Sequence, residues 1–250
     1  MIYYELSSTV EAQIVGVTDG AGQAWIDRQF LDNHKWFNQI FYETELAGAS
    51  WWEKWSEITK YAQKLSEIKM EKKAKHTDYI NFPRFMRGFI VNNRLREILE
   101  NAHLPNHKFL EVTFNQNEKI IDGYWWFVFD METGENTVDF SKCEYDLRYH
   151  KRNFGEDFSV NIKSYQDYLK VFYKTGSAIG VSKLVFNNNF DNELDLFGMQ
   201  FLGSRNYISK RLLKQWQDSK ILGYVARSPE EVKSRALRFN DSFCELIFDE

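Results

Sequence analysis

Two short runs of acidic residues are the first candidates for chemistry in this 250-residue chain. The runs are FDMETGE, with Asp130, Glu132 and Glu135, and FDNELDLF, with Asp191, Glu193 and Asp195. Acids that alternate along a strand point to one side of it, where carboxylates can hold a divalent cation or exchange protons with a substrate. Both runs also carry turn signals, where acids are simply well hydrated. A hydrolytic or metal-dependent enzyme using acids near Asp130 or Asp191 is therefore the alternative, and a hydrated turn is the simpler interpretation.

Other motifs give weaker chemical signals. His103 and His107 have a spacing that could bind zinc on a helix, but Pro105 between them favours a loop. The basic run RYHKR, residues 148–152, could contact phosphates, yet acids surround it and favour a hydrated loop. We therefore expect no catalytic residues, no metal and no cofactor.

Three tryptophans in WWEKW are the strongest candidates for binding a protein. At helical spacing Trp51 and Trp55 share one face, and Trp52 is turned by about 100° from them. An exposed tryptophan is a typical anchor in an interface, although a core role is the simpler interpretation. The candidate partner-binding residues are Trp51, Trp52, Trp55, Asp191, Glu193 and Asp195.

Composition limits the classes of partner. The chain has 32 basic and 36 acidic residues, a net charge of −4 and 43% hydrophobic residues. Because non-specific nucleic-acid binding needs a clustered basic face, we expect no nucleic-acid partner. No apolar run approaches the roughly 18 residues of a membrane span, and the first residues lack the pattern of a signal peptide, so we expect a cytoplasmic protein without membrane contact. Cys143 and Cys244 could form a disulfide, but two free thiols are the simpler expectation in the cytosol.

The elements that must position these residues form a mixed pattern. Apolar residues at spacings of three and four predict helices over 51–72, 92–102, 164–176 and 209–220. Strands are expected at 2–6, 12–17, 107–115, 120–130, 181–186, 194–202, 221–226 and 242–248, with 137–140 pairing back as a hairpin. Because helices and strands alternate without strict βαβ repetition, we predict an α+β fold whose largely antiparallel sheet carries helices on one face.

The predicted organisation is one domain over 1–250. Its residues 19–78 form an aromatic-rich, mainly helical elaboration, and 79–250 form the α+β core. Four helix starts are specified locally. Asn92 or Asn93, Ser164 and Ser209 are expected N-caps, and Ser228 with Glu231 has capping-box spacing.

Several structural motifs together resemble a known family. They are Tyr3-Tyr4 on the first strand, Pro83-Arg84-Phe85 before LREILENA, the aromatic strand YWWFVFD, and ISKRLLKQW followed by ILGYV. This layout resembles the immunity proteins of bacterial polymorphic-toxin systems over roughly residues 80–227. Residues 19–78 depart from the layout.

The resemblance implies a binding protein that neutralises a cognate toxin stoichiometrically in the cytoplasm, without catalysis. The helix at 209–220 would then help to hold a surface. Two alternatives remain beside this interpretation: the enzyme described above and a structural or assembly module. Metal lost on Asp130→Ala or Asp191→Ala would favour the enzyme, and large particles would favour the assembly module.

Overall fold

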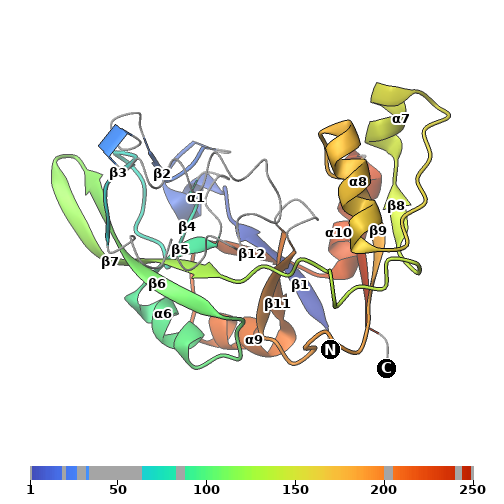
Figure 1. Cartoon of the computed structure of the whole chain (residues 1–250). Helices are drawn as coiled ribbons and strands as arrows, with labels where there is room; N and C mark the ends of the chain where they lie inside the picture. Colours follow the sequence, from blue (N-terminus) through green and yellow to red (C-terminus); the bar gives the residue numbers. More distant parts are fainter. Residues whose placement is uncertain are drawn as a thin grey trace. The chain divides into compact units, whose positions relative to one another are not determined.

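The computed structural model describes residues 2–18, 21–26, 32–33, 64–82, 88–199, 205–239 and 244–248 (Figure 1). The chain divides into two compact units. Unit 1 comprises Met1–Glu5, Met131–Lys210 and Ala226–Glu250, and unit 2 comprises Leu6–Asp130 and Arg211–Val225. The helices and the mostly antiparallel sheets confirm the α+β class. The expectation of one domain with an elaboration at 19–78 stays a prediction.

Unit 2 is built on a six-stranded sheet with the order β2-β3-β6-β7-β5-β4. Its strands are β2 (Ala24–Trp25), β3 (Lys64–Met70), β4 (Tyr79–Ile80), β5 (Phe89–Asn92), β6 (His107–Gln116) and β7 (Lys119–Phe129). Of these pairings, β3 with β6 is parallel and the others are antiparallel. The unit also contains α1 (Ala12–Val15), α6 (Asn93–Glu100) and most of α9 (Lys210–Asp218).

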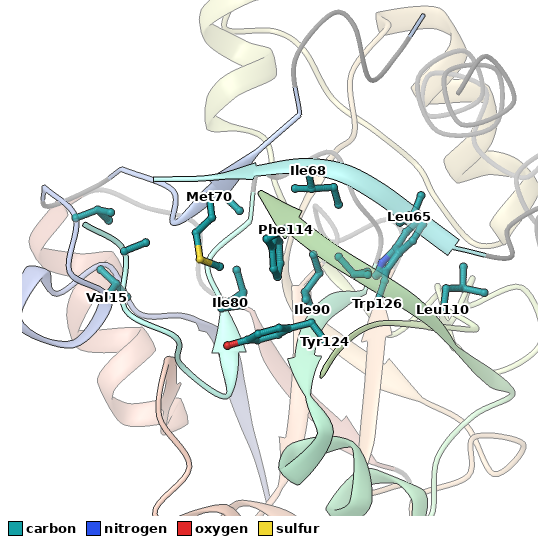
Figure 2. Close-up of a cluster of buried hydrophobic side chains, with 14 of the residues drawn as sticks. Val15, Leu65, Ile68, Met70, Ile80, Ile90, Leu110, Phe114, Tyr124 and Trp126 are labelled. Carbon is teal, nitrogen blue, oxygen red and sulfur yellow. The ribbon is translucent and has the colours of Figure 1, made fainter. Parts of the chain in front are cut away.

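The core of unit 2 lies against one face of this sheet (Figure 2). Phe114 on β6 and Trp126 on β7 are fully buried there. Residues Trp126–Phe129 are buried on both faces of β7, as their continuous apolar run predicts. Trp125, which points to the opposite face from Trp126, is only partly buried.

Helix α6 covers the other face and follows its sequence pattern. Asn92 caps it: the side-chain oxygen accepts a hydrogen bond from the Leu95 N–H at 3.0 Å. Leu95 and Leu99, four residues apart, are both fully buried. The sides of α6 that are not buried carry polar residues, which reach solvent or the neighbouring strands.

Helix α9 confirms the helix predicted near the end of the chain. Leu212, Leu213 and Trp216 form its buried face. The Trp216 ring contacts Tyr79 at a centroid distance of 6.4 Å and Tyr224 at 5.0 Å. Gly223 follows with φ +103°, and a Cβ there would lie 2.0 Å from the Tyr79 carbonyl oxygen. Only glycine can therefore occupy this position between α9 and the strand that follows it.

Two smaller sheets, with the orders β10-β11-β1-β12 and β13-β9-β8, belong mostly to unit 1. Their strands are β1 (Tyr3–Ser8), β8 (Glu144–Asp146), β9 (Gly180–Phe186), β10 (Leu196–Met199), β11 (Arg205–Ser209), β12 (Tyr224–Arg227) and β13 (Glu245–Phe248). Strands β1 and β12 each run from one unit into the other. The helices are α7 (Arg148–Phe154), α8 (Tyr165–Thr175) and α10 (Pro229–Phe239).

Two helix starts in unit 1 confirm local predictions. The Ser164 hydroxyl accepts a hydrogen bond from the Asp167 N–H at 3.2 Å, and α8 then ends at Gly176 in a left-handed conformation. Ser228 and Glu231 form the predicted capping box. The Glu231 carboxylate accepts the Ser228 N–H at 2.7 Å, and the Ser228 hydroxyl accepts the Glu231 N–H at 3.2 Å.

Four local predictions are wrong. Residues 12–15 are helix α1 rather than part of a strand, and 64–70, placed in the tryptophan-rich helix, are strand β3. The basic run 148–152 lies in helix α7 rather than in a loop. Residues 137–140 do not return as a hairpin; Val138 instead forms an isolated bridge with Phe186. The short apolar runs at 12–15 and 64–70 fit a helix or a strand equally well, and tertiary pairing decides between them.

Candidate functional site

The predicted tryptophan anchors Trp51, Trp52 and Trp55 lie outside the described residues. Their role in binding a partner stays a prediction.

The acids of FDNELDLF do not share one side of a strand. Asp191 and Glu193 are exposed on the turn between β9 and β10, where the Glu193 N–H donates to an Asp191 carboxylate oxygen at 3.0 Å. Asp195 is only 4% exposed, and its carboxylate accepts the Ser209 hydroxyl at 2.7 Å. The alternating arrangement considered as the alternative is therefore not formed, and Asp191 and Glu193 lie on a turn, as the simpler interpretation predicts. Their role in partner binding stays a prediction.

The acids of FDMETGE also act separately. One Glu132 carboxylate oxygen accepts the Gly134 N–H at 2.7 Å and the Thr137 hydroxyl at 2.6 Å, so this side chain organises its own turn. Glu135 is exposed. Asp130 accepts a hydrogen bond from the Asn106 amide at 3.1 Å through Oδ2, and burial raises the pKa of Asp130 above its ordinary value.

Among the described residues, no group of three or more histidine, cysteine or acidic side chains is placed to hold a metal ion. Cys143 and Cys244 are free thiols. His107 lies in β6, and its ring contacts Phe109 and Phe127, which is a packing role.

A different group of side chains in unit 2 forms a candidate interaction surface. We call it the arginine–tryptophan surface, and it consists of Asn93, Arg96 and Glu100 from α6, Phe109 from β6 and Trp125 from β7. The three helix residues lie at positions i, i+3 and i+7, which places them on one face of α6. The two aromatic residues come from the paired strands beside that face.

Arg96 is the centre of this surface. Its guanidinium carbon lies 3.9 Å from the centroid of the Trp125 ring and 5.2 Å from that of Phe109. A guanidinium over an aromatic face is attracted by the ring quadrupole, by about 0.5–1 kcal/mol at exposed sites. Arg96 also forms an ion pair with Glu100 at 2.7 Å. The side chain is thus fixed from two sides while 29% of it remains exposed.

The Trp125 indole is fixed as well. Its N–H donates to the Asn93 side-chain oxygen at 2.6 Å. A partner would therefore meet an ordered arginine and an ordered tryptophan, whose side-chain entropy is already reduced before binding. Arginine, tryptophan and tyrosine are the residues most enriched in interface hot spots.

The sequence predicts the helix residues of this surface but not their contact with the strands. The stripe of Leu95 and Leu99 predicts which face of α6 is buried, and hence that Asn93, Arg96 and Glu100 are available on another side. The contact of Arg96 with Trp125 joins residues far apart in sequence, and no local pattern predicts it.

The model of the immunity protein family Imm11 matches residues 22–230, and the chain belongs to this family. The match begins well before the 80–227 range that the motifs indicate, so it includes most of the region thought to depart from the family. No curated protein matches the chain. In the part of the chain that the structure describes, no helix is long and apolar enough to cross a membrane.

Proposed function

We propose that this protein neutralises a cognate toxin by binding it stoichiometrically in the cytoplasm of the cell that makes both. The observation that carries the proposal is membership of the Imm11 immunity family over residues 22–230. The proposed mode of action is binding and occlusion rather than catalysis.

The arginine–tryptophan surface is the contact we assign to the toxin. Arg96 and Trp125 are partly exposed, mutually ordered and of the residue types that dominate interface energies. A standard protein interface buries about 1,600 Å² in total, so this surface would be the centre of a larger contact.

The first experiment isolates the tagged protein from its native host at native expression and identifies the proteins that accompany it. The expected result is one stoichiometric partner that is toxic when expressed alone and harmless when expressed with this chain. A preparation without such a partner would contradict the proposed function.

The second experiment measures the affinity of that partner for variants of the surface. Arg96→Ala and Trp125→Ala are each expected to weaken binding at least tenfold, because a hot-spot truncation costs about 2 kcal/mol or more. Lys108→Ala removes one positive charge from an exposed position on β6 outside the surface and is the matched control. Equal affinities for all three variants would move the contact elsewhere without affecting the proposed function.

A further inference from the structure

A short segment of unit 2 carries a cluster of exposed lysines that the arginine–tryptophan surface does not include. We call residues 69–76 the lysine loop; it begins with the last residues of β3 and leads towards β4. Its four exposed lysines are Lys69, Lys72, Lys73 and Lys75. The loop carries one acid, Glu71, and its net charge is +3 in a chain whose net charge is −4. The positive charges therefore form a surface that is opposite in sign to the chain as a whole.

The side chains of Gln116 and Asn117 hold the first half of the lysine loop. Gln116 on β6 is 9% exposed, and its Nε2 donates to the carbonyls of Glu71 and Ala74, at 2.8 and 2.9 Å. Asn117, in the turn after β6, donates from Nδ2 to the Lys72 carbonyl at 3.2 Å. These hydrogen bonds come from a neighbouring strand and its turn, so they fix the backbone of the loop while its lysine side chains remain exposed.

Gln23 and the residues of helix α1 hold the second half of the loop. Gln23 is fully buried; its Nε2 donates to the Lys75 carbonyl at 2.8 Å, and its own carbonyl accepts the Glu71 N–H at 2.8 Å. The Lys75 N–H donates to the Val15 carbonyl at 2.9 Å. A partner would therefore meet a loop whose backbone is already ordered, which lowers the entropy cost of binding.

Two of the lysines have no partner for their charge within the described residues. The ammonium groups of Lys72 and Lys73 form neither an ion pair nor a hydrogen bond with any described residue. Lys75 differs, because its Nζ donates to the Gln13 carbonyl at 2.7 Å. Adjacent like charges repel each other, and an acidic group placed against both would be attracted by each of them. The loop is thus complementary in charge to carboxylates.

The pattern within the loop favours a protein as the source of those carboxylates. Glu71 lies among the lysines and would repel a polymer of uniform negative charge, whereas a folded protein can place a neutral or basic group beside it. Single-stranded nucleic acids are bound by aromatic rings that stack on the bases, and the loop contains no Phe, Tyr or Trp. Insertion into a membrane surface needs exposed apolar side chains, and those of Met70 and Ala74 are buried.

We propose that the lysine loop receives an acidic surface of the toxin and, through its charge, accelerates the approach of the two proteins. The identity of the partner as the toxin rests on the proposed function. Charges at the rim of an interface mainly change the association rate constant and its dependence on salt, whereas truncating a buried anchor mainly changes the dissociation rate constant. The lysine loop therefore acts on a different step of binding from Arg96 and Trp125.

The first test measures, by stopped-flow fluorescence, how fast the whole protein associates with the toxin that the isolation experiment identifies. The double variant Lys72→Gln, Lys73→Gln is expected to lower the association rate constant about fivefold at an ionic strength of about 0.01 M, where the Debye length is about 30 Å. The difference should shrink as the ionic strength rises to about 0.15 M, where the Debye length is about 8 Å. The dissociation rate constant should change by less than about twofold.

The matched control is the double variant Lys163→Gln, Lys174→Gln, which removes the same charge from exposed positions in unit 1. Because both double variants change the net charge of the protein equally, a difference between them reports the position of the charges. Equal association rate constants for the two double variants would overturn the proposal, while the proposed function stands. Circular dichroism verifies that both variants are folded.

A second measurement tests the chemistry of the loop without the toxin. Fluorescence anisotropy follows the binding of the whole protein to a labelled peptide of alternating glutamate and serine. The loop variant is expected to bind this peptide about fivefold more weakly than the wild type and the control variant, as the loss of exposed ion pairs allows. Equal binding by the two double variants would overturn the proposal, as would tighter binding of the wild type to oligothymidylate or to phosphatidylserine vesicles than to the peptide. The expected peptide binding by a protein that neutralises no toxin would support the chemistry of the loop and remove the proposed function.

Discussion

Arg94 donates two parallel hydrogen bonds to the buried carboxylate of Asp78, from Nε to Oδ1 at 3.0 Å and from Nη2 to Oδ2 at 2.6 Å. The same carboxylate accepts the Asn92 amide and the Leu222 N–H, both at 2.8 Å. Arg94 also donates to the Lys220 carbonyl at 3.1 Å. One acidic side chain thus joins the start of α6, the approach to β4 and the segment after α9 within unit 2.

Asp78→Ala is expected to lower the free energy of unfolding by about 3 kcal/mol, because it removes the acceptor that the part-buried donors of Asn92, Arg94 and Leu222 share. Arg94→Lys is expected to cost less, about 1 kcal/mol, since Arg94 is half exposed and Asp78 keeps its other donors. Urea unfolding measures the free energy of unfolding of both variants. Equal losses for the two variants would mean that the arginine, rather than the carboxylate, organises this junction.

Local signals predicted much of the fold correctly. The caps at Asn92, Ser164 and Ser228 could be predicted from the sequence because each is a contact between residues three positions apart. Strands β6 and β7 could also be predicted, because each is an apolar-rich run in the sequence. The mixed order of helices and strands then gave the α+β class.

Strand β3 shows why other parts could not be predicted. Leu65 and Ile68 are both fully buried, and a spacing of three is typical of a helix. The structure instead places an irregularity of the β3–β6 pairing between them, which brings both side chains to the same face. The pairing partner lies more than 40 positions along the chain, at Val112 and Phe114, so no local pattern reveals it.

The candidate arginine–tryptophan surface could not be predicted for the same reason. The Arg96–Trp125 contact combines side chains from elements far apart in sequence. The acid runs mark turns, as the simpler interpretation predicts, and His107 makes a packing contact.

The turn between β6 and β7 offers a test of backbone strain. Asn117 and Glu118 both have positive φ, +52° and +66°. Two-residue hairpin turns of this kind favour Asn followed by Gly, because a side chain in the left-handed region costs about 1 kcal/mol or more. Glu118→Gly is expected to raise the free energy of unfolding by about 0.5–1 kcal/mol, measured by urea unfolding. Glu118→Ala removes the carboxylate without relieving the backbone and should give no such gain; a gain from both would point to charge instead.

The free energy of unfolding is expected to depend on pH through Asp130. Burial raises its pKa, so the folded state favours the protonated form. The stabilisation that protonation brings is complete below the ordinary pKa of 3.8 and is lost as the pH rises through the raised value. Asp130→Asn removes this titration. Its free energy of unfolding minus that of the wild type should therefore be larger at pH 7 than at pH 3, by at most about 1 kcal/mol because solvent screens a half-buried group. An equal difference at both pH values would contradict the assignment.

Replacing His150 on α7 is expected to stabilise the folded protein. It is fully buried, and neither ring nitrogen has a hydrogen-bond partner within the described residues. The ring stacks against Phe154 and Phe158, at centroid distances of 5.9 and 5.2 Å. An unpaired buried polar group costs about 1–3 kcal/mol, so His150→Phe, which keeps an aromatic ring between the same neighbours, should raise the free energy of unfolding by about 1–2 kcal/mol.

The control for His150 is its neighbour Tyr149, which is 57% exposed. Tyr149→Phe also removes a polar group from α7 and should change the free energy of unfolding by no more than about 0.5 kcal/mol. Chemical denaturation followed by tryptophan fluorescence measures both variants. A loss of stability in His150→Phe alone would show that the imidazole makes a hydrogen bond, through water or a ligand, that the cluster of aromatic rings requires.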